Sequence, residues 1–103
     1  MSPYCPDTDK YDVLDRIIAR IQDKAANGET FAGRRIDSVL TVNGARIMLD
    51  NGAWGLVRAS SNTPNLVVVC ESPESDAELR QIFADLDAVI RTEPLVGAYD
   101  QTL

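Results

Sequence analysis

The chain has 103 residues, of which 45% are hydrophobic and 25% are charged, and this length fits one small domain over residues 1–103. Sixteen acidic side chains against ten basic ones give a net charge of −6, the opposite of the balance on most nucleic-acid-binding domains, so we expect no nucleic-acid partner. No apolar run approaches the ~18 residues of a membrane span and no signal peptide is visible, so we expect a cytoplasmic protein that does not contact a membrane.

The first predicted helix begins near Asp7 or Thr8 and ends at Asn27-Gly28. Either of the first two side chains can cap free N–H groups, and glycine suits the left-handed position that follows a helix. Apolar residues recur at three- and four-residue spacing, which predicts one buried face. This face consists of Tyr11, Leu14, Ile17, Ile18, Ile21 and Ala25.

Four strands are predicted in the middle of the chain. They span residues 35–42, 45–50, 54–59 and 66–70. The dipeptides Asn43-Gly44 and Asn51-Gly52 separate the first three strands and suit tight hairpin turns. In the second strand, Ile47 and Leu49 share one face. The fourth strand is continuously apolar, which is typical of a strand in the middle of a sheet.

A second helix follows the strands. Ser72 can cap it with Pro73 in the first position, or Ser75 and Glu78 can form a capping box one turn later. Its predicted buried face consists of Leu79, Ile82, Phe83, Leu86, Val89 and Ile90. The order of elements predicts an α+β fold: a four-stranded antiparallel sheet with two helices packed on one face, which is a two-layer sandwich.

The segment from Arg58 to Pro64 has the most distinctive chemistry. It joins two apolar strands and places an arginine beside Ser60, Ser61, Asn62 and Thr63. A guanidinium can hold a phosphate through two hydrogen bonds, and hydroxyl and backbone N–H groups of a curved loop can add more. The same residues are also common in plain polar turns with a solvated arginine. The residue types alone therefore leave both interpretations open, with the plain turn favoured.

The chain offers little for catalysis. It contains no histidine, which excludes a Ser-His-Asp or Cys-His arrangement within these residues. Cys5 and Cys70 lie far apart and form no CxxC pair, so neither a zinc site nor a redox motif is predicted. We expect both thiols to be reduced and Cys70 to be a small core residue. No residue is predicted to be catalytic or to bind a metal.

Other charged side chains are expected to have ordinary roles. Arg34-Arg35 is interpreted as a solvated loop, and Arg46 as one half of an ion pair with a neighbouring acid. Trp54 is expected in the core or on the sheet surface. The acidic residues Asp85, Asp87 and Glu93 are expected to form a solvated face, because their directions around a helix diverge.

Residues 50–64, read Asp-Asn-Gly-Ala-Trp-Gly-Leu-Val-Arg-Ala-Ser-Ser-Asn-Thr-Pro, resemble the C-terminal domain of the α-D-phosphohexomutases. That family includes phosphomannomutase/phosphoglucomutase, whose branch the segment resembles more, and phosphoglucosamine mutase. Its phosphate-binding loop has the form Arg-x-Ser-(Gly/Asn)-Thr-x-Pro. The run Cys5-Pro6-Asp7, followed by Lys10-Tyr11, also resembles the start of that domain, and the run from Asn43 to Ile47 resembles its Asp-Gly-x-Arg-Val segment.

The resemblance implies roles for the loop residues. Arg58 matches the arginine that grips the substrate phosphate, and Ser60 matches the loop serine. Ser61 stands where the family has glycine or asparagine, and Asn62 stands where it usually has threonine. Thr63 occupies the variable position. The implied phosphate-binding set is thus Arg58, Ser60, Ser61, Asn62 and Thr63.

The resemblance also implies a function. The chain would bind the substrate phosphate and close the active site of a phosphosugar mutase, which moves a phosphoryl group between sugar positions 1 and 6. The full enzyme would use a phosphoserine, Mg²⁺ on an Asp-Gly-Asp-Gly-Asp loop, and a Gly-Glu-x-Ser-Gly loop that reads the sugar. None of these motifs occurs here, so the remaining domains would be absent from this chain.

Two consequences follow for the isolated chain. It would bind no cofactor and would be inactive alone, and its partners would be the phosphosugar and the other domains of the same enzyme. The alternative is a stand-alone, non-catalytic module that binds a phosphate, a phosphosugar or another protein.

Overall fold

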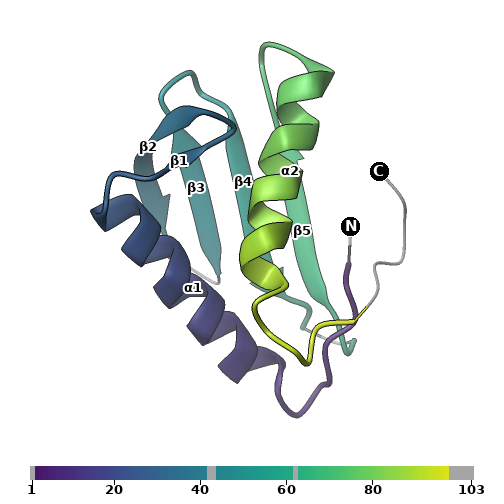
Figure 1. Ribbon diagram of the computed structural model, residues 1–103. Coiled ribbons are helices and arrows are strands. Elements are labelled where there is room, and N and C mark those ends of the chain that lie inside the picture. The colour runs from purple at the N-terminus through teal and green to yellow at the C-terminus, as the bar shows by residue number, and fades with distance from the viewer. Residues whose placement is uncertain (1, 42–43, 62, 98–103) are drawn as a thin grey trace.

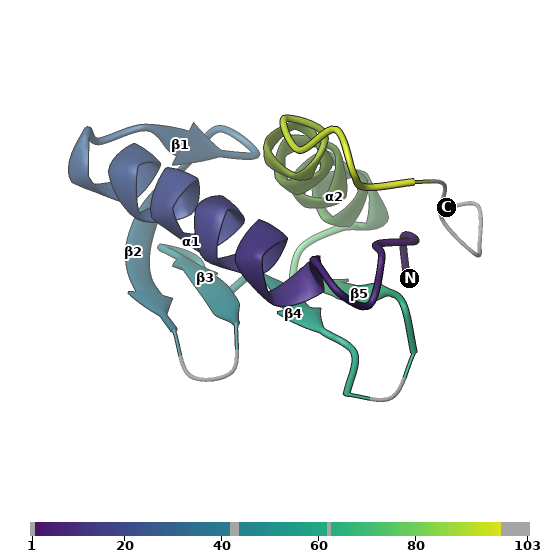
Figure 2. The ribbon, with the colours of Figure 1, turned by 90° about the horizontal axis from the view of Figure 1, so that it is seen from below.

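The computed structural model describes residues 2–41, 44–61 and 63–97 (Figure 1). The elements in chain order are α1 Lys10–Ala26, β1 Thr30–Phe31, β2 Arg34–Leu40, β3 Ala45–Leu49, β4 Trp54–Ala59, β5 Leu66–Glu71 and α2 Asp76–Ile90. The strands form one antiparallel sheet in the order β1-β2-β3-β4-β5. Both helices cover the same face of this sheet, as Figure 2 shows from below. The predicted α+β fold with two helices on one face is therefore confirmed.

The number of strands differs from the prediction. The sheet has five strands and not four, because the short strand β1 pairs with β2 through Thr30↔Arg35 and Phe31↔Arg34. A two-residue strand is too short to show an alternating pattern in the sequence. Its turn is also unusual, because Ala32 has a φ of 52°, which few residues other than glycine adopt.

The fourth predicted strand was placed wrongly in the middle of the sheet. It is β5, which lies at one edge of the sheet and pairs with β4 alone among the strands. Its apolar residues point both ways: Leu66 and Val68 are buried beneath the helices, whereas Val69 is 40% exposed on the open face. A continuous apolar run shows that both faces of a strand are apolar, but it does not show whether a neighbouring strand pairs with each of its two edges.

The first helix begins later than predicted. Its N-terminal flanking residue is Asp9, whose side chain makes no capping hydrogen bond. The chain turns just before the helix, because the Pro6 carbonyl accepts from the N–H groups of both Asp9 and Lys10 at 2.9 Å. The buried face also differs from the predicted one: Tyr11 is 57% exposed. The buried residues of α1 are Lys10, Val13, Leu14, Ile17 and Ile21.

The second helix follows the later of the two predicted starts. Ser75 flanks α2, and its side chain accepts from the Glu78 N–H at 3.1 Å. The helix packs closely over β4 because Gly55 has no side chain there. A Cβ atom at this position would lie 3.1 Å from Cγ2 of Ile82 and 3.5 Å from Cδ2 of Leu86. The largest buried side chains of α2 therefore reach the centre of the sheet.

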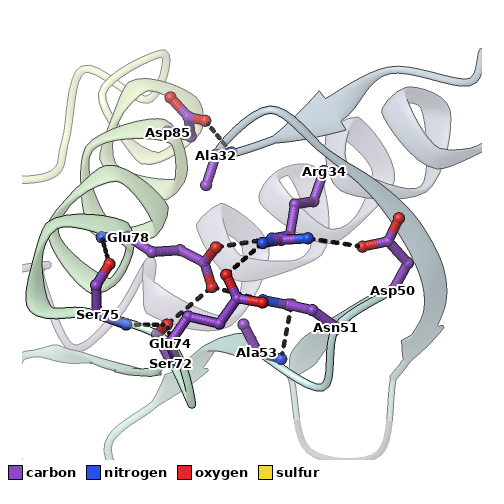
Figure 3. Close-up of polar contacts among 10 residues, drawn as sticks. All are labelled: Ala32, Arg34, Asp50, Asn51, Ala53, Ser72, Glu74, Ser75, Glu78 and Asp85. Carbon is purple, nitrogen blue, oxygen red and sulfur yellow. Dashed lines mark hydrogen bonds and ion pairs between the residues drawn. The ribbon is translucent and has the colours of Figure 1, made fainter.

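A polar network fastens the start of α2 to the sheet (Figure 3). Arg34 lies at its centre: Nε donates to Glu78 at 2.7 Å, and the guanidinium also pairs with Glu74 at 2.5 Å and Asp50 at 3.7 Å. The expectation of a solvated loop at Arg34 was wrong. Hydrogen bonds from Arg34, and then from Asn51 and Ser72, lower the pKa of Glu78 to about 2.

The expectation of a solvated acidic face was also wrong for Glu93. Glu93 as a residue is nearly buried, at 4% exposure, and its carboxylate receives hydrogen bonds from Arg16, at 2.7 Å, and from Arg20. Burial by itself raises the pKa of this carboxyl, but the two arginines outweigh burial and hold the pKa below its ordinary value. Asp85 likewise has a structural contact, since it accepts from the Ala32 N–H at 2.7 Å (Figure 3).

On the open face of the sheet, Arg46 makes a cation–π contact with an aromatic ring and not the ion pair that was expected for it. The guanidinium of Arg46, on β3, lies 4.3 Å from the ring centroid of Trp54, on β4. Attraction between a cation and the face of an indole ring stabilises such a pair. Trp54 is thus a partly exposed residue of the sheet surface.

Candidate functional site

The candidate site is the connection between β4 and β5. It lies beside the N-terminal segment that leads into α1 (Figure 2). Arg58 is the last but one residue of β4 and pairs in register with Val67 of β5. Val57 is buried, so the alternation of the strand places the Arg58 side chain on the exposed side. A regular, paired strand thus carries this arginine to the edge of the loop.

Arg58 is free for a ligand in the described structure. Among residues 2–41, 44–61 and 63–97, its guanidinium makes no hydrogen bond or ion pair. Arg34, by contrast, is occupied by three carboxylates. An exposed arginine without a protein partner keeps all of its donors for an anion from solution.

The hydroxyl side chains of the loop have different positions. Ser60 is nearly buried at 9% exposure, and its Oγ accepts from Oγ1 of Thr63 at 2.7 Å. Ser61 and Thr63 are exposed. Asn62 lies outside the described residues. Of the predicted set, the structure therefore pairs Ser60 with Thr63 inside the loop and leaves the side chains of Arg58 and Ser61 open to solvent.

Arg58 and Ser61 share a groove of about 620 Å³. The groove runs between α1, the end of β2 and the end of β4. Its lining residues are Tyr11, Leu14, Asp15, Ile18, Thr41, Gly44, Arg58, Ala59 and Ser61. Sequence reasoning missed the contribution of α1, because the contact between its exposed edge and β4 exists only in the folded chain.

Gly44 brings the start of β3 directly against Arg58. It has a φ of 138°, and a Cβ atom there would lie 2.3 Å from the Val57 carbonyl oxygen and 2.9 Å from Cβ of Arg58. No side chain fits in this space, and the backbone conformation itself favours glycine. The wall of the groove beside Arg58 therefore requires a glycine.

The N-terminal segment supports the loop from the side of the protein interior. The N–H of Cys5 donates to the Pro64 carbonyl at 2.9 Å, and the N–H of Leu66 donates to the Pro3 carbonyl at 3.0 Å. Lys10 is 3% exposed, and its Nζ donates to the Thr63 carbonyl at 3.0 Å. The sequence analysis did not predict that Lys10 is buried. The one signal in the sequence is its position at the start of an amphipathic helix.

The described residues hold no metal-binding cluster beside the loop. No group of three or more Cys, Asp or Glu side chains in the described ranges could hold a metal ion, so these residues do not fit Mg²⁺. Both cysteines are free, and burial raises the pKa of the Cys70 thiol to about 11, so this thiol is a poor nucleophile near neutral pH. Cys70 itself is only partly buried against the core.

The arrangement can bind and orient an anion. It places an exposed arginine and an exposed serine in the lining of one groove, on a loop that is hydrogen-bonded to the N-terminal segment. None of the described helices is long and apolar enough to cross a lipid bilayer.

These observations define the class of structure: a two-layer α+β domain with an exposed arginine and an exposed serine where its fourth strand meets the following loop. Residues 5–89 match the family model described as phosphoglucomutase/phosphomannomutase, C-terminal domain. The chain therefore belongs to this family of phosphomutase C-terminal domains, as the resemblance of its loop predicts. The match favours this identity over a stand-alone binding module.

Several curated proteins are similar to the chain. A phosphopentomutase of Thermococcus kodakarensis is 36% identical over 69 residues, which are 67% of this chain and 14% of that protein. A probable phosphoglucosamine mutase of Methanopyrus kandleri is 34% identical over 84 residues, 80% of this chain and 16% of that protein. A phosphomannomutase/phosphoglucomutase of Pseudomonas putida is 51% identical over 45 residues, 44% of this chain and 9% of that protein. The chain thus spans less than one fifth of the length of these relatives.

Proposed function

We propose that residues 1–103 act as the substrate-closing domain of a longer phosphosugar mutase, and that the loop from Arg58 to Thr63 binds the phosphate of the sugar. The observation that carries the proposal is that Arg58, which has no ion pair among the described residues, lines the same groove as Ser61. The names of these relatives support the substrate class, because each one names a mutase of a phosphorylated sugar. The reaction would move a phosphoryl group between positions 1 and 6 of a hexose.

Each loop residue has a distinct part in this proposal. Arg58 binds two phosphate oxygens through its planar guanidinium, and Ser61 adds a hydroxyl donor. The hydrogen bond from Thr63 to Ser60 fixes the curvature of the loop. Asn62, which the family resemblance also assigns to the phosphate-binding set, is expected to add a further contact. Binding the phosphate away from the reacting bond orients the sugar, which is a large part of catalysis in such reactions.

The chemical step belongs to the other domains in this proposal. No group of three or more Cys, Asp or Glu side chains among the described residues could hold a metal ion, so we expect Mg²⁺ and the phosphoserine to lie elsewhere in the longer protein, and the 103-residue chain to be inactive alone. Closure of this domain over the bound sugar would complete the active site and exclude water.

The test is a titration of the 103-residue chain with glucose 6-phosphate, followed by the amide signals of Ser60 and Ser61 in NMR spectra. A hydrogen bond to a charged group contributes about 1.5–3 kcal/mol, so Arg58→Ala should raise the Kd about ten- to a hundredfold. Arg35→Ala is the matched control, because Arg35 is 71% exposed and contacts Asp37 at 3.5 Å. It should leave the Kd unchanged.

Two results would contradict the proposal. The amide signals of the loop could remain unshifted in the unsubstituted chain, or Arg58→Ala and Arg35→Ala could weaken binding equally. Glucose itself, without phosphate, is the ligand control and should produce no shift.

A further inference from the structure

Lys10 is a buried charged residue that the proposed phosphate contacts do not use. It is 3% exposed, and its ammonium group has two partners: the Thr63 carbonyl oxygen at 3.0 Å and the Asp7 carboxylate at 2.7 Å. Nζ also lies 5.4 Å from the ring centroid of Tyr11. Burial of an ammonium group costs free energy unless it is paired and hydrogen-bonded. A buried and paired lysine in contact with the loop is therefore a candidate for a role in the loop.

The backbone carbonyls on the return arm of the loop are all held by donors from within the protein. The Thr63 carbonyl accepts from Lys10 Nζ at 3.0 Å and from the Asn65 N–H at 2.8 Å. The Pro64 carbonyl accepts from the Cys5 N–H at 2.9 Å, and the Asn65 carbonyl accepts from the Ser60 N–H at 3.0 Å. Carbonyl oxygens repel a phosphate, whereas N–H and hydroxyl groups attract it. Holding these oxygens keeps them from turning toward a bound anion.

Lys10 is the one side chain in this set, and it provides the only positive charge among these donors. It lies 53 residues before the carbonyl that it holds. The other donors are backbone N–H groups. Its counter-ion, Asp7, has a side chain that is 69% exposed, so water screens the carboxylate more than the ammonium. The pair thus holds the ammonium group in place against the loop backbone.

We propose that Lys10 is a positioning residue of the phosphate loop. Paired with Asp7, it holds the Thr63 carbonyl inward and fixes the loop in the shape that receives a phosphate group through Arg58 and Ser61. Lys10 acts through the loop backbone and does not contact the phosphate. This role rests on the proposed function of the loop.

The test compares Lys10→Met with the unsubstituted 103-residue chain. Methionine keeps the length and the apolar stem of lysine but removes the donors. Two quantities are measured at a temperature where each variant is fully folded: the Kd for inorganic phosphate, from the amide shifts of Ser60 and Ser61, and amide hydrogen exchange at Ser60 and Asn65 without ligand. We expect Lys10→Met to raise the Kd about tenfold or more and to accelerate exchange in the loop.

Two control variants separate positioning from stability. Lys24→Met removes a lysine that pairs only with Glu29 among the described residues, at 3.3 Å, on the far end of α1. Ile82→Val weakens the core beneath α2, away from the loop. Both should keep the Kd and the exchange rates of the loop, although Ile82→Val lowers the melting temperature. A purely structural lysine would behave like Ile82→Val.

The outcomes are distinguishable. An unchanged Kd in folded Lys10→Met overturns the inference and leaves the proposed phosphate site intact. Absence of any phosphate-induced shift in the unsubstituted chain overturns the site itself, and with it the role of Lys10. Where Lys10→Met does not fold, Asp7→Asn takes its place, because it removes the counter-ion of Lys10 from a side chain that is largely exposed. A Kd for Asp7→Asn equal to that of the unsubstituted chain then overturns the inference.

Discussion

Replacing Glu93 by glutamine should destabilise the fold far more than the same change at a surface glutamate. The Glu93 side chain is 3% exposed and accepts hydrogen bonds from Arg16 and Arg20, which join the segment after α2 to α1. Glutamine keeps the volume of the side chain but loses the charge that both arginines contact. Stability is the quantity to measure, since Glu93 lies outside the candidate phosphate site.

The magnitude follows from the exposure of each partner. Hydrogen bonds to a charged group contribute about 1.5–3 kcal/mol each when buried. Arg16 and Arg20 are 51% and 43% exposed and can turn to water when Glu93 changes, so the two contacts together should contribute about 1.5–3 kcal/mol. For a domain of this size, that loss lowers the Tm by about 6–24 °C.

The pH dependence adds a second criterion. The pKa of Glu93 is lower in the folded chain than in the unfolded chain. Its contribution is therefore present above the unfolded pKa of about 4.3 and is lost as the pH falls through the folded pKa. Urea unfolding at pH 7 and at pH 3 should show a large difference between Glu93→Gln and the unsubstituted chain at pH 7 and a smaller one at pH 3.

The matched control is Glu29→Gln, because Glu29 is 49% exposed and pairs with Lys24 at 3.3 Å. It should cost less than about 1 kcal/mol. Equal losses for the two glutamine variants would refute the argument that burial of the carboxylate decides its contribution. So would a difference for Glu93→Gln that does not shrink at pH 3.

Two further substitutions test other parts of the structure. Gly44→Ala should lower the urea midpoint of unfolding, because its Cβ would lie 2.3 Å from the Val57 carbonyl oxygen. The backbone conformation alone should lower the free energy of unfolding by about 1–3 kcal/mol. An unchanged midpoint would show that β3 does not approach β4 so closely. Arg46→Ala should cost about 0.5–1 kcal/mol and change the fluorescence of Trp54, because the guanidinium covers the indole ring. Arg35→Ala should leave the fluorescence unaltered, and an equal change in both variants would contradict the contact.

Local patterns in the sequence predicted the elements that depend on neighbouring residues. The turn at Asn51-Gly52 and the polar loop after Ala59 predicted β4 with its observed bounds, and the capping box of Ser75 and Glu78, one of two predicted starts, is the start of α2. The order of apolar faces was enough to predict two helices on one side of the sheet. These features follow from periodicity and capping, which act over a few residues.

The features that were missed depend on contacts between distant residues. The burial of Glu93 requires Arg16, which is 77 residues away, and the burial of Lys10 requires the Thr63 carbonyl, which is 53 residues away. No local pattern reports such partners. At the candidate site, the sequence predicted the loop as one connection, but the groove needs the edge of α1, and the hydroxyl pair of Ser60 and Thr63 needs the fold of the loop.

The two ends of the described chain meet at one corner of the domain, where the Gly97 N–H donates to the Tyr4 carbonyl at 2.7 Å. The strands, in contrast, each pair with their neighbours in the chain. Because closing a long loop is entropically costly, we expect the strand hairpins to form early in folding and this corner to close last. Substitutions at Glu93 should then accelerate unfolding and leave the refolding rate almost unchanged in stopped-flow experiments, whereas slower refolding would show that the corner forms before the folding barrier.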